Sequence, residues 1–97
     1  MKYLILFLFS PYLLISQDKG QTYYNEKEFN KAIEYYENHL RVDSETDGAK
    51  FGIGASAYQL GEKEAALRIF KDLSSSSDSL LKSKAFFNVA TLMHEKE

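Results

Sequence analysis

The feature that most constrains this sequence is a similarity of the chain to itself at one fixed offset, the one that places Gly54 on Gly20. At that offset Ala32 also falls on Ala66, Ile33 on Leu67, and Tyr36 on Phe70. The match ends at Leu40, which falls on Ser74. Self-similarity at a fixed period of about 34 residues is typical of proteins in which one supersecondary unit stacks on the next. The sequence therefore predicts an array of repeated units.

The spacing within each unit has a physical reading. We expect two antiparallel helices joined by a short turn, with a glycine on the first helix where the second helix crosses closely. Ala32 and Ala66 are then the small residues of the second helices, and the aromatic residues one turn later fill the space between hairpins. From residue 29 to residue 40 the apolar residues recur at the spacing of a helix with one buried face.

These residues resemble the tetratricopeptide repeat, whose pattern is a large residue, then Leu-Gly, then Tyr, then Ala, then an aromatic. The pattern is carried in the first copy by Gly20, Tyr23, Ala32 and Tyr36, and in the second by Ile53, Gly54, Ala66 and Phe70. Three positions depart from it, with Ala57 replacing a tyrosine, His39 a small residue and Ser44 a proline. The resemblance implies an all-α fold of antiparallel helical hairpins in a short right-handed superhelical array of about two and a half repeats.

The chain divides into an N-terminal signal and a repeat domain. We expect a signal peptide at residues 1–16 and a repeat domain at 17–97. In that domain the first repeat covers about 17–46, the second about 47–80, and the first helix of a third about 81–97. The helices are expected at about 17–26, 29–41, 47–59, 63–74 and 80–95. In the third unit Ala90 takes the place of Gly54, an offset two residues longer than the first, so the connector before it carries two extra residues.

Turns and caps follow from residue type. Gly61 is expected to adopt a left-handed conformation after the third helix. Ser44 or Thr46 is expected to cap the start of that helix through a side-chain oxygen. The run from Ser74 to Ser79, with four consecutive serines and an aspartate, favours a loop.

The N-terminus has the layout of an export signal. A positive start, Met1-Lys2, precedes Tyr3 to Ile15, which is apolar except for Ser10-Pro11. A membrane span needs about 20 apolar residues, whereas the apolar region of a signal peptide has about 7–15. We expect cleavage after Ser16 and a periplasmic or membrane-associated location. A buried first helix and an uncleaved anchor remain open as alternatives.

Composition excludes several kinds of chemistry. The chain has no cysteine, which removes disulfides, zinc-thiolate sites and thiol catalysis. The net charge of −2 offers no basic surface for nucleic acid. The only histidines, His39 and His94, are far apart in the sequence, and the serine run has no matching base. We therefore predict a protein that is not an enzyme and that needs no cofactor or metal.

The surface expected to bind a partner is the concave groove that first helices line in repeats of this type. The groove positions are Gln21, Tyr24, Asn25, Phe51, Ala55, Tyr58, Gln59, Lys84, Phe87, Asn88 and Thr91. Their aromatic members give an aromatic floor for a peptide, although burial in the core is an equal alternative for each. One subclass of these repeats grips a C-terminal carboxylate. Only Lys84 and Asn88 agree with its pattern, so no such clamp is expected.

The leading hypothesis is an exported scaffold or adaptor that binds a protein or peptide partner in the bacterial envelope. The export start, the hairpin order and the stretch from Leu81 to Asn88 are similar to repeat proteins of bacterial aerotolerance (Bat) operons, which implies envelope complexes with other Bat proteins. Two alternatives stay open. The chain is the N-terminal part of a longer repeat protein whose activity lies further on, or it self-associates through Val89, Leu92 and Met93 of the last helix.

Overall fold

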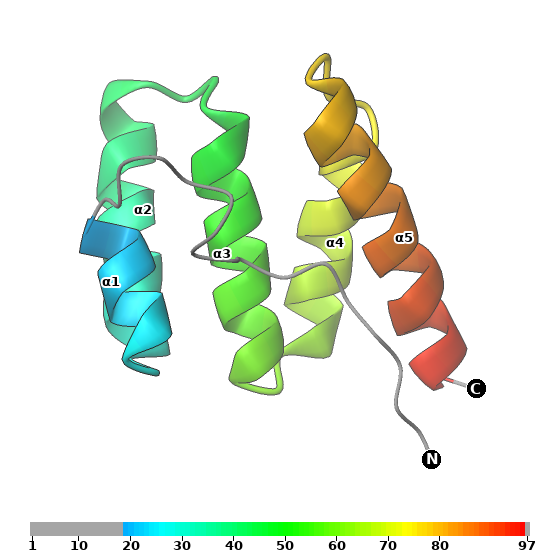
Figure 1. The fold of residues 1–97 in the computed structure, drawn as a ribbon, viewed down its shortest axis with the longest axis horizontal. Coiled ribbons are helices and arrows are strands. Elements are labelled where there is room, and N and C mark those ends of the chain that lie inside the picture. The colour runs from blue at the N-terminus through cyan, green and yellow to red at the C-terminus, as the bar shows by residue number, and fades with distance from the viewer. Residues whose placement is uncertain (1–18, 97) are drawn as a thin grey trace.

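A computed structural model describes residues 19–96 of the chain, and this part is all-α (Figure 1). Its five helices are α1 (Lys19–Asn25), α2 (Phe29–Val42), α3 (Asp47–Gln59), α4 (Lys63–Leu73) and α5 (Ser79–Lys96). The predicted helices are confirmed, with ends that differ by about two residues or fewer, a usual scatter for helix termini. The predicted signal peptide at residues 1–16 lies outside the described residues.

The helices form two layers, and each packs on its neighbours in sequence. α3 contacts α2 and α4, and it also touches α1 and α5. Figure 1 shows α1 in front of α2 at one side, α3 in the middle, and α4 and α5 at the other side. This order follows from short connections, because a helix joined to the next by a few residues must run back along it. Segments far apart in sequence, α1 and α5, therefore contribute to the same layer.

The turns inside the two hairpins are built in the same way. In the first, the backbone N–H of Lys27 donates to Tyr24 O at 3.0 Å and that of Glu28 to Tyr23 O at 2.8 Å. In the second, the equivalent bonds run from Gly61 to Tyr58 O and from Glu62 to Ala57 O, both at 2.9 Å. The residue in the left-handed region is Gly61 with φ 84° and, in the first turn, Lys27 with φ 64°. The prediction for Gly61 is confirmed, and the same conformation at Lys27 was missed because lysine carries no turn signal.

A glycine faces an aromatic ring in each hairpin. A methyl group added to Gly20 would overlap the ring of Tyr36, and one added to Gly54 would lie 3.0 Å from Cζ of Phe70. All four of these residues are buried. The predicted close crossings between first and second helices are therefore present at both positions.

The larger core cluster lies where α3, α4 and α5 meet. It contains Phe51, Ala57, Ala66, Leu67, Phe70, Leu73, Ala85 and Leu92. The rings of Phe51 and Phe70 meet edge to face with their centroids 5.3 Å apart, a favourable arrangement for two aromatic rings. A smaller cluster of Tyr24, Ala32 and Ala55 holds the first hairpin against α3.

The serine-rich connector lies between α4 and α5 at residues 74–78. Asp78 Oδ1 accepts hydrogen bonds from the backbone N–H groups of Leu80 at 3.0 Å and Leu81 at 3.2 Å, which caps the start of α5. Ser76 Oγ donates to Asp47 Oδ2 at 2.5 Å and ties the connector to the start of α3.

The predicted cap of α3 is wrong in its bonding. Thr46 stands at the cap position but makes no side-chain cap bond. Its hydroxyl donates instead to Asp43 O at 3.2 Å, so the side chain bonds backward to the preceding turn rather than forward to the helix.

Candidate functional site

The eleven residues predicted to line the groove come from α1, α3 and α5, which share one layer. They are Gln21, Tyr24 and Asn25 on α1, Phe51, Ala55, Tyr58 and Gln59 on α3, and Lys84, Phe87, Asn88 and Thr91 on α5. The helical spacing puts the members of each group on the same side of their helix. The layer therefore carries a row of candidate binding residues drawn from both ends of the chain.

Two hydrogen bonds connect members of this row. Nε2 of Gln59 donates to the Tyr24 hydroxyl at 3.1 Å, which links α3 to α1 across 35 residues of sequence. Nε2 of Gln21 donates to Oδ1 of Asn25 at 3.1 Å along α1. Burial raises the pKa of Tyr24, and the bond from Gln59 partly offsets this effect. The first two helices of the layer are thus joined by polar side chains that both belong to the predicted row.

Three of the predicted residues pack in the core. Phe51 is 2% exposed and lies against Phe70, so its ring supports α4. The ring of Tyr24 is 5.2 Å from that of Phe29, and Ala55 packs in the same cluster. For these residues the core alternative describes the structure, because a ring at a helix crossing gains more from packing than from standing in a groove. The aromatic floor is correspondingly smaller than predicted.

Tyr58 ties the end of α5 to the second hairpin. Its hydroxyl donates to Oε2 of Glu95 at 3.1 Å, and Nζ of Lys63 lies 3.0 Å from Oε1 of the same carboxylate. Burial raises the pKa of Tyr58, and the negative charge of Glu95 and the hydrogen bond to it raise it further. The Glu95 interactions raise the pKa of Lys63 in the same way. This side chain therefore holds α5 in place, a role that the sequence analysis did not assign.

The polar residues of α5 that were predicted to bind a partner lie on its buried side. Asn88 is fully buried, and Lys84 and Thr91 are nearly so. Burial lowers the pKa of Lys84, and the charge of Asp78 opposes that effect. Buried polar side chains are uncommon because they lose contact with water. Because these polar side chains are buried on α5, and Gln21 is buried on α1, the interior of this layer is more polar than an ordinary apolar core.

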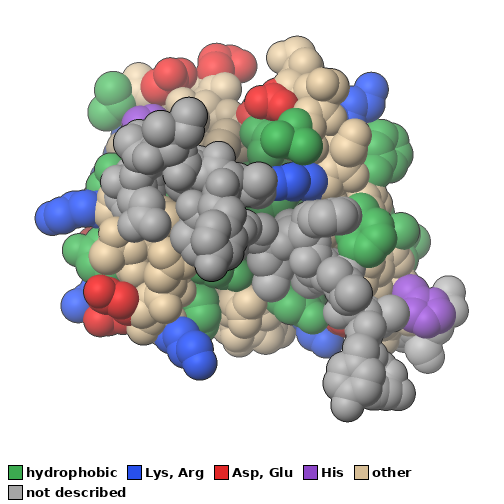
Figure 2. Space-filling view, in the orientation of Figure 1, with side chains coloured by type: hydrophobic (Ala, Val, Ile, Leu, Met, Phe, Trp, Pro, Cys, Tyr) green, Lys and Arg blue, Asp and Glu red, His purple; other side chains and the backbone are tan. Residues whose placement is uncertain are grey.

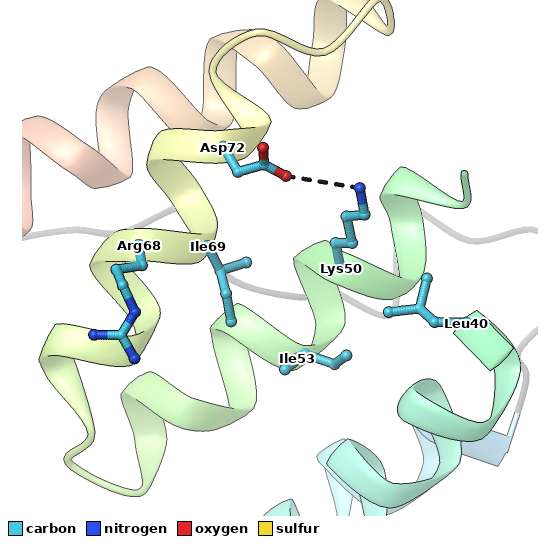
Figure 3. A pocket seen from close by; sticks show the side chains of 6 residues that line it. All are labelled: Leu40, Lys50, Ile53, Arg68, Ile69 and Asp72. Atoms are coloured by element: carbon cyan, nitrogen blue, oxygen red, sulfur yellow. Dashed lines mark ion pairs between the residues drawn. The ribbon is translucent and has the colours of Figure 1, made fainter. Parts of the chain in front are cut away.

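A pocket that the sequence analysis missed lies on the other side of α3, between α2 and α4 (Figure 3). Leu40, Ile53 and Ile69 form its apolar wall, and Figure 3 shows Ile53 and Ile69 pointing into the space between α3 and α4. Lys50 lies at its edge with Nζ 3.6 Å from Oδ2 of Asp72. The cavity has a volume of about 230 Å³. The only sequence feature that pointed to this pocket was the apolar stripe between residues 29 and 40, which ends at Leu40.

Within residues 19–96, no three side chains of His, Asp or Glu gather where they could hold a metal ion. None of the helices in that range combines the length and the apolar character that crossing a membrane requires. Comparison of the chain with known protein families, with curated proteins and with solved structures found no match.

Proposed function

We propose that this chain is an exported scaffold of the tetratricopeptide class that binds a segment of another envelope protein on its α1–α3–α5 layer. The observation that carries the proposal is that two amide side chains of this layer, Asn25 on α1 and Gln59 on α3, are exposed, while the polar side chains of Gln21, Asn88 and Thr91 in the same layer are buried. Amide and hydroxyl groups can both donate and accept hydrogen bonds, as recognition of a peptide backbone requires.

The repeat class is supported by the equivalence of the two hairpins. Their turns share hydrogen bonds at the same offset that places Gly54 on Gly20. Both hairpins place a glycine of the first helix against an aromatic ring of the second. A helical hairpin that recurs at this period is the unit of a tetratricopeptide array. Scaffold function is the usual work of such arrays, because stacked first helices create an extended surface.

Photocrosslinking at a residue of the layer tests the proposed binding surface. Gln59 is exposed at the end of α3, so a photoreactive amino acid placed there is expected to form a discrete adduct with one envelope protein in cells. The matched control is Val42, which is 90% exposed at the end of α2 in the other layer. No adduct from position 59, or the same adduct from both positions, contradicts the proposed surface.

Export is tested on the natural chain. We expect the protein recovered from the cell envelope to begin at Gln17, so its intact mass should lack residues 1–16. Recovery of the full-length chain from the cytosol contradicts export. Recovery of the full-length chain from membranes favours an uncleaved anchor instead. The crosslinked partner, once identified by mass spectrometry, also tests whether the similarity to Bat-operon proteins extends to their complexes.

A further inference from the structure

The helix α5 repeats much of the burial pattern of α3. At the offset that places Ala90 on Gly54, four positions are buried in both helices: Ala49 and Ala85, Gly52 and Asn88, Ala55 and Thr91, Ser56 and Leu92. Three positions are buried in α3 but exposed in α5: Phe51 and Phe87, Gly54 and Ala90, Ala57 and Met93. These three positions follow one another at spacings of three residues and mark a face that is buried on α3 and exposed on α5.

That face of α3 is the one that α4 covers. Phe51 packs on Phe70 of α4, and Gly54 lies against the side chains of Ile69 and Phe70. Ala57 belongs to the same core cluster as Ala66 and Phe70. The exposed face of α5 is thus the place where, in the preceding hairpin, a second helix lies.

The exposed face of α5 is apolar. Phe86 is 57% exposed, Met93 is 49% exposed, and Ala90 lies between them. Figure 2 shows hydrophobic side chains gathered along the edge of the molecule that α5 forms. Large apolar side chains that stand together on a surface are typical of an interaction site. Phe87, the counterpart of Phe51, is 41% exposed on the same face, and we call the face formed by Phe86, Phe87, Ala90 and Met93 the α5 outer face.

The two hairpins show what kind of element fits such a face. In both, the covering helix is amphipathic, carries a fully buried alanine (Ala32 or Ala66), and places an aromatic ring four residues later against the small residue of the first helix. Ala90 takes the place of that small residue on α5. A small residue lets a second helix approach closely, and the spacing of four keeps alanine and ring on the same stripe.

Ala90 and Met93 replace Gly54 and Ala57 on this face, and a third replacement changes its charge. Phe86 stands where α3 has Lys50, and Lys50 pairs with Asp72 of α4 at 3.6 Å. The Asp72 side chain is 69% exposed, so an equivalent carboxylate over Phe86 would keep most of its water, but it would find no cation and would leave the ring without an apolar contact. The helix that fits α5 best therefore carries an apolar residue where α4 carries its aspartate.

We propose that the α5 outer face binds an amphipathic helix of a partner protein, antiparallel to α5. That helix carries a small residue, an aromatic residue four positions later, and an apolar residue two positions after the aromatic. Of the residues first predicted to bind an extended segment, only Phe87 lies on this face, and the variants that test the two surfaces leave it unchanged, so either surface can fail its test without the other. It would let the protein hold a folded partner at its edge.

The probe for this site is a fluorescent peptide with the sequence of residues 60–75 and the change Asp72→Leu, titrated into the full chain while anisotropy is measured. We expect saturable binding, and about tenfold or greater weakening for the peptide that also carries Phe70→Ala, because a buried aromatic is lost. The peptide that retains Asp72 should also bind more weakly than the probe.

Two variants of the protein form a matched pair. Phe86 and Leu80 are each 57% exposed on α5, but only Phe86 lies on the outer face. We expect Phe86→Gln to weaken binding of the probe about tenfold, and Leu80→Gln to leave it unchanged. Binding that both variants reduce equally, or that neither reduces, overturns the proposal.

A second measurement covers the case in which the isolated peptide is too weakly helical to bind. A copy of residues 60–75 with Asp72→Leu, joined directly after Glu95, replaces the diffusing peptide by a tethered one. We expect the Tm of this fusion to be about 5 °C higher than that of a fusion in which the added copy, and not the native helix, carries Phe70→Asp. No rise in Tm together with no peptide binding overturns the proposal. A full chain that sediments as a dimer and is dissociated by Phe86→Gln overturns it in favour of a second copy on this face.

Discussion

The first hairpin, α1–α2, and the second, α3–α4, both pack two helices through a glycine that faces an aromatic ring. Their turn hydrogen bonds recur at equivalent positions with closely similar lengths. Their surroundings differ within residues 19–96, because α3 and α4 lie between other helices whereas α1, with seven residues, is the first helix. The turn geometry of a hairpin is therefore set by its own two helices, whereas its stability also depends on the helices packed against it.

The residues at equivalent positions show the same division. Phe70 is fully buried and packs on Phe51, whereas Tyr36, its counterpart, is 3% exposed and crowds Gly20 more closely than Phe70 crowds Gly54. The left-handed turn position is glycine in the second hairpin and lysine in the first. The second hairpin is thus the better fitted of the two, and each difference can be tested by exchanging or truncating a residue.

The largest expected effect is at the aromatic pair. Phe70→Ala should lower the free energy of unfolding by about 3–5 kcal/mol, because a ring is removed from the main core. Tyr36→Ala should cost less, since within residues 19–96 the helix it covers, α1, packs against fewer helices than α3 does. Urea unfolding followed by circular dichroism measures both. Equal losses at the two positions would show that the hairpins are energetically alike.

The next effect concerns the glycines at the helix crossings. Gly20→Ala should destabilise the protein by about 1–3 kcal/mol, because the new methyl group must displace the Tyr36 ring. Gly54→Ala should be closer to neutral, since the contact at 3.0 Å is less severe and alanine favours the helix by about 1 kcal/mol. Repeating Gly20→Ala in a Tyr36→Leu background is the control. If the cost is the same there, the ring is not its cause.

Exchange of the turn residues should change stability in opposite directions. Lys27→Gly should raise the free energy of unfolding, and Gly61→Lys should lower it, each by about 1 kcal/mol, because a side chain in the left-handed region is strained. The side chain added in Gly61→Lys meets no steric obstacle at its first atom, because a methyl group added to Gly61 has no neighbour within 4 Å. Thermal unfolding of both variants measures the effect, and a loss of stability in Lys27→Gly would contradict this reading of the first turn.

The smallest effect distinguishes two equivalent tyrosines. Burial raises the pKa of both Tyr24 and Tyr58, and Glu95 raises only that of Tyr58 further. Glu95→Gln should therefore lower the pKa of Tyr58 and leave that of Tyr24 unchanged, as followed by the ultraviolet absorbance of tyrosinate in the Tyr24→Phe and Tyr58→Phe backgrounds. A pKa raised by folding gives stability that is present below about pH 10 and lost as pH rises through the folded value. An unchanged pKa of Tyr58 in Glu95→Gln would contradict the role assigned to Glu95.

Much of the fold could be predicted because its signals are local. The stripe through Ala32 and Tyr36, the glycine at 61 and the serine run marked helices and breaks within a few residues. Lys27 and Thr46 were missed or misassigned for the opposite reason. Whether a lysine adopts a left-handed turn, or a threonine bonds forward or backward, depends on small energies that the surrounding packing decides.

The candidate site could be predicted less well. Helical spacing correctly placed Gln21, Tyr24 and Gln59 on helices of one layer, and two of them bond to each other. The same spacing could not separate a groove residue from a core residue when both lie on adjacent strips of a helix. Phe51 and Tyr58 show the difficulty, because one supports α4 and the other holds Glu95.

By itself the sequence determined the five helices and the register of the two hairpins, because periodicity, small residues at crossings and turn residues act along the chain. Only the tertiary structure decided which aromatic rings enter the core, which side chains join α1 to α3 and α5 to α3, and which face of α5 stays uncovered. These outcomes depend on how helices far apart in sequence rotate and pack against each other, and small differences in burial then select among residues of the same type.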